Sequence, residues 1–223
     1  MIYLDNAATT KPSKAAVDAM CKAAECFGNP SSLYGLGLDA EKLINQSKAV
    51  IAKKLGIEHR CIYFTSGGTE ANNTAVCGTA YAKEKLGKRL ITTQIEHPSV
   101  LEAFKKIEKD GFDVVYIRAE RKGRIKNDEL KEALNEDTVL VSVMHVNNET
   151  GVIQPVDEIK ALMKQKSPKA LLHCDCVQSF GKIPVEPKKW GADMITISAH
   201  KIHGFKGTGA LCMLNGKIRQ LLY

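Results

Sequence analysis

The segment SAHKIHGFKGTG places Lys201 between His200 and His203, directly after a β-rich run. A lysine on a solvated face needs no such surroundings, whereas a lysine that attacks a carbonyl must be able to lose its proton. A single lysine among the 32 lysines and arginines of the chain carries no argument by itself. Lys201 is therefore a candidate nucleophile whose significance depends on the residues that surround it.

A second candidate is the segment FTSGGTEANN, where a β-rich run ends in glycines and a helical stretch begins near Thr69. Glycine lets the backbone approach a ligand closely, and the free N–H groups of a helix N-terminus attract anions. Gly68 and Thr69 could therefore bind a phosphate. An ordinary glycine turn with a capping Ser or Thr, and with Glu70 near the helix N-terminus, explains the segment equally well.

The segment HCDCVQSFGK carries an acid inside an apolar strand. Alternation along the strand puts His173 and Asp175 on one face and the two cysteines, Cys174 and Cys176, on the other. This separation matches no standard zinc site, so we expect no metal and expect the cysteines to be small buried residues. A buried Asp175 is costly without a cationic partner, and a protonated pyridine nitrogen would be such a partner.

Two further strand ends carry polar side chains. His97 in IEHPS follows a β-rich run and precedes a helix with Pro98 in its first turn. It could stack on a flat ring, carry protons near neutral pH, or simply cap the helix. Asn147 and Asn148 in MHVNNETG could bond a carboxylate or a phenolic oxygen, although Asn and Gly also favour an ordinary turn.

The apolar pattern of the chain predicts the elements that must position these side chains. Short β-rich runs alternate with stretches of helical spacing. We expect helices at 37–55, 69–85, 98–110, 127–135 and 156–166, and strands at 61–65, 89–94, 113–118, 138–146, 170–177, 193–198 and 209–214. This alternation predicts an α/β fold, with a mostly parallel sheet flanked by helices in three α/β/α layers. Ligands of such sheets bind beyond the carboxyl ends of the strands, where the candidate residues occur.

Taken together, the candidates match the requirements of one cofactor. A site for pyridoxal 5'-phosphate must hold a phosphate, a ring nitrogen, a ring face, a phenolic oxygen and an aldehyde. The chain offers suitable groups at successive strand ends: Gly68 with Thr69, His97, Asn148, Asp175 and Lys201. The joint pattern predicts a pyridoxal phosphate site, which no single segment does.

Composition argues against several other classes of protein. The 223 residues are 44% hydrophobic and 26% charged, as in ordinary globular proteins. No apolar run approaches the roughly 20 residues of a membrane span, and the N-terminus lacks the layout of a secretory signal. The net charge of +7 comes from basic residues mixed with acidic ones, so we expect no nucleic-acid partner. Seven cysteines without paired spacing favour the reducing cytoplasm.

At this point the motifs resemble a known family. The chain is similar to cysteine desulfurases of the NifS/IscS type, in the class V branch of fold-type-I pyridoxal phosphate enzymes. The similar segments occur in the expected order along nearly the whole chain: YLDNAATT, FGNPSS, FTSGGTEANN, EHPSV, MHVNNETGVIQP, HCDCVQSFGK and SAHKIHGFKGTGAL. Two positions depart from the family's HKIYGPKG motif, where His203 and Phe205 replace Tyr and Pro.

The resemblance implies a role for the residues nearest the cofactor ring. Lys201 would bond covalently to pyridoxal phosphate, and His97 would stack on the ring and move protons. Asp175 would pair with the pyridine nitrogen, and Gln178 would bond the phenolic oxygen. Lys201 and His97 are therefore the expected catalytic residues.

The same resemblance implies how the phosphate and the substrate are held. The expected phosphate ligands are Gly68, Thr69, Ser198 and His200. Asn148 would contact both the cofactor and the substrate carboxylate. Asn6, in the DNAATT segment, would line the substrate mouth.

The resemblance also predicts how the chain is organised. We expect residues 1–14 to belong to the small domain or the substrate mouth, and residues 15–223 to form the large cofactor domain. The C-terminal small domain, with its mobile sulfur-accepting cysteine and its substrate-binding arginine, is expected to be absent. None of the seven cysteines matches that mobile loop: Cys21, Cys26, Cys61, Cys77, Cys174, Cys176 and Cys212.

Three functions agree with these observations. The first is a cysteine desulfurase, which removes sulfur from L-cysteine to give L-alanine and a persulfide for iron–sulfur cluster assembly or other sulfur delivery. Such an enzyme would be a homodimer with sulfur-acceptor or scaffold proteins as partners. The second is another class V activity, such as an aminotransferase or a selenocysteine lyase, and NNETGV and HKIHG favour the first over it. The third is a non-catalytic fragment that binds a sulfur-transfer partner.

Overall fold

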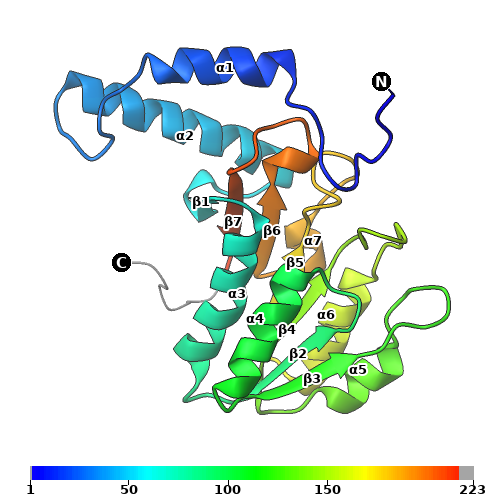
Figure 1. Cartoon of the computed structure of the whole chain (residues 1–223). Helices are drawn as coiled ribbons and strands as arrows, with labels where there is room; N and C mark the ends of the chain where they lie inside the picture. Colours follow the sequence, from blue (N-terminus) through cyan, green and yellow to red (C-terminus); the bar gives the residue numbers. More distant parts are fainter. Residues whose placement is uncertain (1, 216–223) are drawn as a thin grey trace.

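The computed structural model of the chain describes residues 2–215; Met1 and residues 216–223 lie outside that description. Seven strands form one sheet in the order β1-β7-β6-β5-β4-β2-β3 (Figure 1). Their bounds are β1 Ile62–Thr65, β2 Arg89–Thr93, β3 Asp113–Ile117, β4 Thr138–Met144, β5 Leu171–Asp175, β6 Met194–Ser198 and β7 Gly209–Met213.

Most of the sheet is parallel, as the sequence predicts. Strands β3, β2, β4, β5 and β6 run in one direction, and β7 lies antiparallel between β6 and β1. The central strands β4, β5 and β6 are buried on both faces, which explains their nearly continuous apolar sequences. The carboxyl ends of five parallel strands therefore lie at one edge of the sheet.

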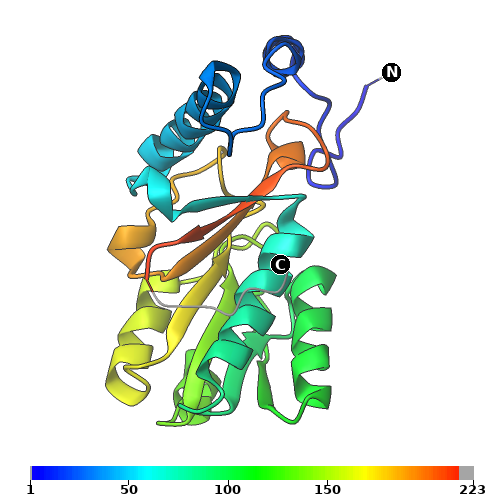
Figure 2. The same cartoon turned by 90° about the vertical axis from the view of Figure 1, so that its left-hand side faces the viewer.

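Helices cover both faces of the sheet. In Figure 2, α3 and α4 lie on one side of it and α6 lies on the other. The helices are α1 Lys14–Ala24, α2 Gly35–Leu55, α3 Gly68–Lys83, α4 Pro98–Lys109, α5 Asn127–Ala133, α6 Val156–Lys166 and α7 Pro187–Trp190, with 3-10 turns η1 His59–Cys61 and η2 Ala199–Lys201. The predicted three-layer α/β/α architecture is confirmed.

Alternation along the strands divides the core into two clusters. Leu140 of β4 packs with residues of α3 and α4, while its neighbour Val141 packs with residues of α5 and α6. Helix α4 shows how a helix meets this surface, because Val100, Phe104 and Ile107 recur at helical spacing and are fully buried. On each face of the sheet, every second side chain of a strand thus packs against the apolar side chains that recur about every 3.6 residues along a helix.

The predicted strands and helices occur within a few residues of their expected positions. The sequence did not predict α1 or the short α7. Helix α1 carries Val17, Met20 and Ala24 at helical spacing, but none of its residues is buried, so this apolar face is exposed in the structure. Together with the first half of α2 it extends away from the sheet (Figure 1).

Two expectations concern larger features of the chain. Within residues 2–215, no helix is both long and apolar enough to cross a membrane. The expected boundary between residues 1–14 and 15–223 stays a prediction, and its ends include residues that the structure does not describe. Locally, an extended segment gives way to α1 at Lys14, whose helix is capped by the hydroxyl of Ser13.

Candidate active site

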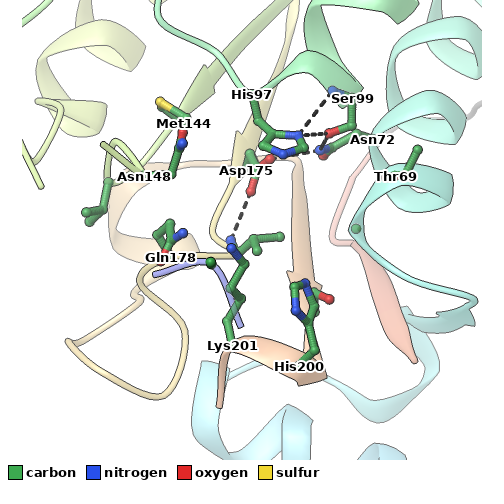
Figure 3. A pocket seen from close by; sticks show the side chains of 15 residues that line it. Thr69, Asn72, His97, Ser99, Met144, Asn148, Asp175, Gln178, His200 and Lys201 are labelled. Atoms are coloured by element: carbon green, nitrogen blue, oxygen red, sulfur yellow. Dashed lines mark hydrogen bonds between the residues drawn. The ribbon is translucent and has the colours of Figure 1, made fainter. Parts of the chain in front are cut away.

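One cavity of about 270 Å³ lies at the carboxyl edge of the parallel strands. Side chains from separate strand ends, helix starts and loops converge on it (Figure 3). Its lining residues are Ala8, Gly68, Thr69, Asn72, His97, Ser99, Met144, Val146, Asn148, Asp175, Val177, Gln178, Ser198, His200 and Lys201. Every predicted site residue except Asn6 lines this cavity.

Lys201 ends the 3-10 turn that follows β6, and its side chain rises into the cavity toward Asp175 (Figure 3). Its ammonium donates a hydrogen bond to the backbone carbonyl of Ala7. Burial lowers the pKa of Lys201, the positive charge of Lys182 lowers it further, and Asp175 with Asp5 acts in the opposite direction. The amine is therefore easier to deprotonate than an exposed lysine, as a nucleophile requires.

The N-terminal segment holds the loop that carries this lysine. Thr10 donates to the carbonyl oxygen of His200 from both its backbone nitrogen, at 2.7 Å, and its hydroxyl, at 2.8 Å. The hydroxyl of Thr10 also accepts from the backbone nitrogen of His203 at 2.7 Å. His203 has a φ of 62°, in the left-handed region that few non-glycine residues occupy. A segment at the start of the chain thus sets the position of Lys201.

Asp175 is the last residue of β5 and is only 5% exposed. Its carboxylate accepts from the side-chain nitrogen of Asn72 at 2.8 Å and from the backbone nitrogen of Val177 at 2.9 Å. Burial raises the pKa of Asp175, whereas these two bonds and the nearby His97 and Lys201 oppose the rise. Both hydrogen-bond donors are neutral, so a cation in the cavity would stabilise the ionised carboxylate.

His97 is both a helix cap and a cavity residue. It is the N-cap of α4, and its Nδ1 accepts from the backbone nitrogen of Ser99 at 3.1 Å. The hydroxyl of Ser99 lies 2.8 Å from the same nitrogen, and the side-chain nitrogen of Asn72 lies 2.9 Å from that hydroxyl. The capping role that the sequence suggests and the position at the cavity are therefore compatible.

The turn before α3 lies close to neighbouring backbone and side chains. A Cβ added at Gly68 would lie 3.0 Å from a methyl carbon of Val177, and one added at Gly209 would lie 2.7 Å from the backbone of Gly67. Glycine therefore lets the start of α3 reach the cavity. Glu70 accepts from the backbone nitrogen of Ser66 at 2.7 Å, and hydrogen bonding by the side chain and then the backbone of Ser66 lowers the pKa of Glu70.

The two asparagines of the NNETG segment differ in their positions. Asn147 is buried, and its side-chain oxygen accepts from the backbone nitrogens of Glu149 and Thr150 at 3.0 Å and 2.8 Å, as in an ordinary turn. Asn148 lines the cavity instead. Gln178 also lines the cavity, and its side-chain nitrogen donates to the carbonyl of Ala7 at 2.8 Å.

Asn6 does not join the other predicted residues. It is exposed in a turn, whereas its neighbours Ala7 and Ala8 contact the lysine loop and the cavity. Its expected role at the substrate mouth stays a prediction.

Sequence reasoning also missed two polar residues of the cavity, Asn72 and Ser99. Their spacing offered a signal, because Asn72 is one helical turn from Thr69 and Ser99 is two residues after His97.

The cysteines lie elsewhere. All seven are free, and no described cysteine lines the cavity. Cys174 and Cys176 are fully buried in the core, where burial raises the pKa of each thiol, as expected for structural cysteines. Burial likewise raises the pKa of Cys212 to about 12.

Comparison with known proteins finds relatives that match most of the chain. The family model for Aminotransferase class-V matches residues 2–222. A protein of Bacillus subtilis (strain 168) named putative cysteine desulfurase IscS 1 is 44% identical over 211 residues, which are 94% of this chain and 55% of that protein. Cysteine desulfurase IscS of Methanosarcina thermophila is 42% identical over the whole chain and is covered to 55%. The chain spans about half the length of the curated relatives it matches.

Solved structures show the same fold. A structure described as a NifS-like protein superposes with a TM-score of 0.96 at 39% identity, covering all of this chain and 61% of its own. A second structure, described as SspA in complex with cysteine, has a TM-score of 0.94 at 34% identity and is covered to 65%.

Proposed function

Because this chain belongs to the class-V aminotransferase family, we propose that it binds pyridoxal 5'-phosphate and acts in the removal of sulfur from L-cysteine. Members of this family depend on that cofactor. The observation that carries the proposal is the convergence of Lys201, Asp175 and His97 on one cavity. An amine, a buried acid and an imidazole from three different strand ends are what this cofactor requires.

The part of the cavity around Asp175 fits the pyridine ring of the cofactor, because the carboxylate of Asp175 has no bonded cation among the described residues. This buried carboxylate has only neutral hydrogen-bond donors, Asn72 and Val177, at its two oxygens. A buried carboxylate is stabilised by a cation, and a protonated pyridine nitrogen is a cation with an N–H to donate. Asp175 would therefore hold the ring nitrogen, and Gln178, which also lines the cavity, would donate to the phenolic oxygen.

The part of the cavity at the start of α3 suits a phosphate. The N-terminus of α3, a helix of 16 residues, begins there with Gly68, and Thr69 adds a hydroxyl. The space in front of Gly68 is one that a side chain would fill, since an added Cβ would touch Val177. Ser198 and His200 line the same cavity. These groups would donate to phosphate oxygens, and the helix N-terminus favours the negative charge.

Two residues would act on the bound molecules. When bound, pyridoxal phosphate supplies a carbonyl for amines and a ring that takes up electrons released at the substrate's α-carbon. Lys201, with its lowered pKa, would provide the attacking amine and would afterwards be free to move a proton. His97 would pack on the ring and exchange a proton through the ring nitrogen that Ser99 does not contact.

L-Cysteine is the proposed substrate. Support comes from relatives named cysteine desulfurase and from the similar structure described as a complex with cysteine. Asn148 lines the cavity and would bond the substrate carboxylate. Sulfur-acceptor proteins and a second copy of the chain are the proposed partners, and a role in iron–sulfur cluster assembly is proposed from the same relatives.

Covalent trapping tests the cofactor assignment. The purified chain should turn yellow with pyridoxal phosphate, and borohydride reduction should fix the cofactor to the peptide that contains Lys201. Lys201→Ala should abolish this label, whereas Lys206→Ala, in the same loop, should retain it. Recovery of the label on Lys182 or another lysine, as found by mass spectrometry, would refute the assignment.

Incubation with L-cysteine and a reductant tests the reaction. The described cysteines lie outside the cavity, so we expect a spectral change with L-cysteine but no repeated release of alanine and sulfide. Multiple turnovers that disappear in Lys201→Ala would show that desulfuration needs no other thiol.

A further inference from the structure

We propose that Asn72 is a positioning residue which, through Ser99, keeps the proton of neutral His97 on Nε2 and links His97 to Asp175. The geometry lies within this chain, and only its value for catalysis rests on the proposed function. Figure 3 shows these four side chains together at the top of the cavity. They come from α3, from α4 with its cap, and from the end of β5.

The orientation of the Asn72 amide follows from its neighbours. Its nitrogen lies 2.8 Å from a carboxylate oxygen of Asp175 and 2.9 Å from the hydroxyl oxygen of Ser99. An ionised carboxylate can only accept, so the amide must turn its NH₂ group toward Asp175. The second hydrogen of the same NH₂ group then points to Ser99, and both donors of Asn72 are used.

The direction of the next bond follows in turn. Because the Ser99 hydroxyl accepts from Asn72, its own hydrogen is available for Nδ1 of His97, 2.8 Å away. The backbone nitrogen of Ser99 donates to the same Nδ1 at 3.1 Å, and a backbone N–H has no other role. With two donors aimed at it, Nδ1 must be the acceptor. Neutral His97 therefore carries its hydrogen on Nε2.

The hydrogen bonds of Asn72 and Ser99 are shielded from solvent. Asn72 is 1% exposed and Ser99 is 9% exposed, so water does not compete for these bonds. The side-chain oxygen of Asn72 is buried and has no hydrogen-bond partner among the described residues, which is unfavourable for an amide. An unsatisfied buried oxygen on an otherwise fully bonded amide indicates that the two donors, rather than the acceptor, account for asparagine at this position.

The consequence concerns the proton that the cavity can use. With Nδ1 occupied by Ser99, only Nε2 of His97 can give or take a proton at a bound ligand. Asn72 also joins α3 to the first turn of α4 and to the end of β5, and so links His97 to Asp175. Loss of Asn72 should leave the fold in place but release the ring of His97 and one oxygen of Asp175.

Nitrogen-15 NMR of histidine-labelled chain tests the tautomer directly and needs no cofactor. Protonated and unprotonated ring nitrogens have well-separated shifts, and His97→Gln identifies the signals of His97. We expect unprotonated Nδ1 and protonated Nε2 in the wild type, and a detectable Nδ1–H form in Asn72→Leu and in Ser99→Ala. Asn73→Leu is the matched control, because Asn73 bonds only the backbone carbonyls of Thr69 and Ser99.

The possible results test the positioning role of Asn72 independently of the proposed binding of pyridoxal phosphate. A wild-type His97 protonated on Nδ1, or a tautomer unchanged in both Asn72→Leu and Ser99→Ala, overturns the positioning role even if the chain binds pyridoxal phosphate. The expected tautomer in a chain that fails to bind the cofactor would support the positioning role and refute the proposed function. Ser99→Ala keeps the test available if Asn72→Leu does not fold.

A double-mutant cycle on pyridoxal phosphate affinity provides a second readout. Asn72→Leu should weaken binding by about tenfold, the loss expected for one buried hydrogen bond. If Asn72 acts partly through His97, its effect should be smaller in a His97→Gln background, so that the two changes are not additive. Strict additivity would show that Asn72 acts on Asp175 alone and would contradict the link to His97.

Discussion

Two buried aspartates lie at opposite edges of the same sheet and are held in different ways. Asp193, at the amino edge before β6, accepts from the ammonium of Lys160 at 2.7 Å and from the backbone nitrogen of Leu172 at 2.8 Å. Asp175, at the carboxyl edge after β5, accepts only from neutral donors and faces the cavity. Both are almost inaccessible, at 7% and 5% exposure. Burial therefore does not distinguish them, but the charge of their partners does.

The comparison indicates that the charge of its bonded partners shows whether a buried acid serves the fold or binds a ligand. At the amino edge the chain supplies its own cation, so the acid is compensated by the fold and holds α6 to the sheet. At the carboxyl edge the nearest amine, Lys201, bonds the carbonyl of Ala7. A charge left without a bonded cation beside a cavity is suited to a cationic ligand. The four predictions below test this difference, beginning with the largest expected effect.

The largest effect should follow from breaking the compensated pair. Asp193→Asn leaves the ammonium of Lys160, whose side chain is 15% exposed, without its carboxylate. Removal of one partner of a buried pair costs about 3–5 kcal/mol of unfolding free energy. Urea denaturation should show this loss, and the double variant Asp193→Asn with Lys160→Met should recover part of it. A loss below 1 kcal/mol would mean that the ion pair is not needed for stability.

Asp175→Asn should act on ligand binding and not on the fold. The ionised carboxylate is disfavoured by burial, so its replacement should change the unfolding free energy by about 1 kcal/mol or less. Affinity for pyridoxal phosphate should fall by at least about tenfold, because a charge-assisted bond to the ring nitrogen is lost. Urea denaturation measures the unfolding free energy, and absorbance titration of the same samples measures the affinity for pyridoxal phosphate. A destabilisation as large as that of Asp193→Asn would make Asp175 a structural acid.

A third buried acid shows what happens when no cation is available. Glu96 accepts from the hydroxyl of Thr93 at 2.7 Å and from the backbone nitrogen of Met144 at 2.9 Å, and its other oxygen has no partner. Burial raises the pKa of Glu96 to about 8 from an ordinary 4.5. The folded chain therefore keeps a proton that the unfolded chain releases between these two values, so wild-type stability falls as the pH rises through this interval.

Glu96→Gln should remove that dependence. Relative to the wild type, the variant should gain unfolding free energy between pH 5 and pH 8, with a slope of at most about 1.4 kcal/mol per pH unit. Urea denaturation at several pH values measures the difference, and Glu102→Gln, on the exposed face of α4, provides the control. A difference that stays constant with pH would show that Glu96 is ionised in the folded chain.

The smallest effect concerns the amine at the carboxyl edge. Lys182 bonds the side-chain oxygen of Gln178 at 3.0 Å, and its charge is the second cause, after burial, of the lowered pKa of Lys201. Lys182→Met should raise the pKa of Lys201 and move the pH midpoint of pyridoxal phosphate attachment upward. Lys189→Met, which removes an exposed lysine of α7, should leave the midpoint unchanged. An unchanged midpoint in Lys182→Met would show that solvent screens this charge completely.

Much of the fold could be predicted because its signals are local. Strands such as β4 are continuous apolar runs, and α4 has a proline at its start and Gly111, with a φ of 90°, after its end. The exposed helix α1 was not predicted, although Val17, Met20 and Ala24 recur there at helical spacing. An apolar stripe predicts a helix, but it does not show whether the helix buries that stripe.

The residue types of the site were likewise determined by the sequence. Lys201 and His97 follow strands and Asp175 ends one, and parallel strands bring their carboxyl ends together whatever the loops contain. The order of these motifs along the chain was enough to predict a shared cavity and the family to which the chain belongs.

Only the tertiary structure decided which groups those residues contact. The bond from Lys201 to Ala7 joins residues 194 positions apart, and the bond from Asn72 to Asp175 joins residues 103 positions apart. The same long-range packing gives Asp193 a lysine, leaves Asp175 with neutral donors and raises the pKa of Glu96. Charge compensation, tautomer and pKa depend on atoms within a few ångströms in space, and separation along the sequence carries no record of that distance.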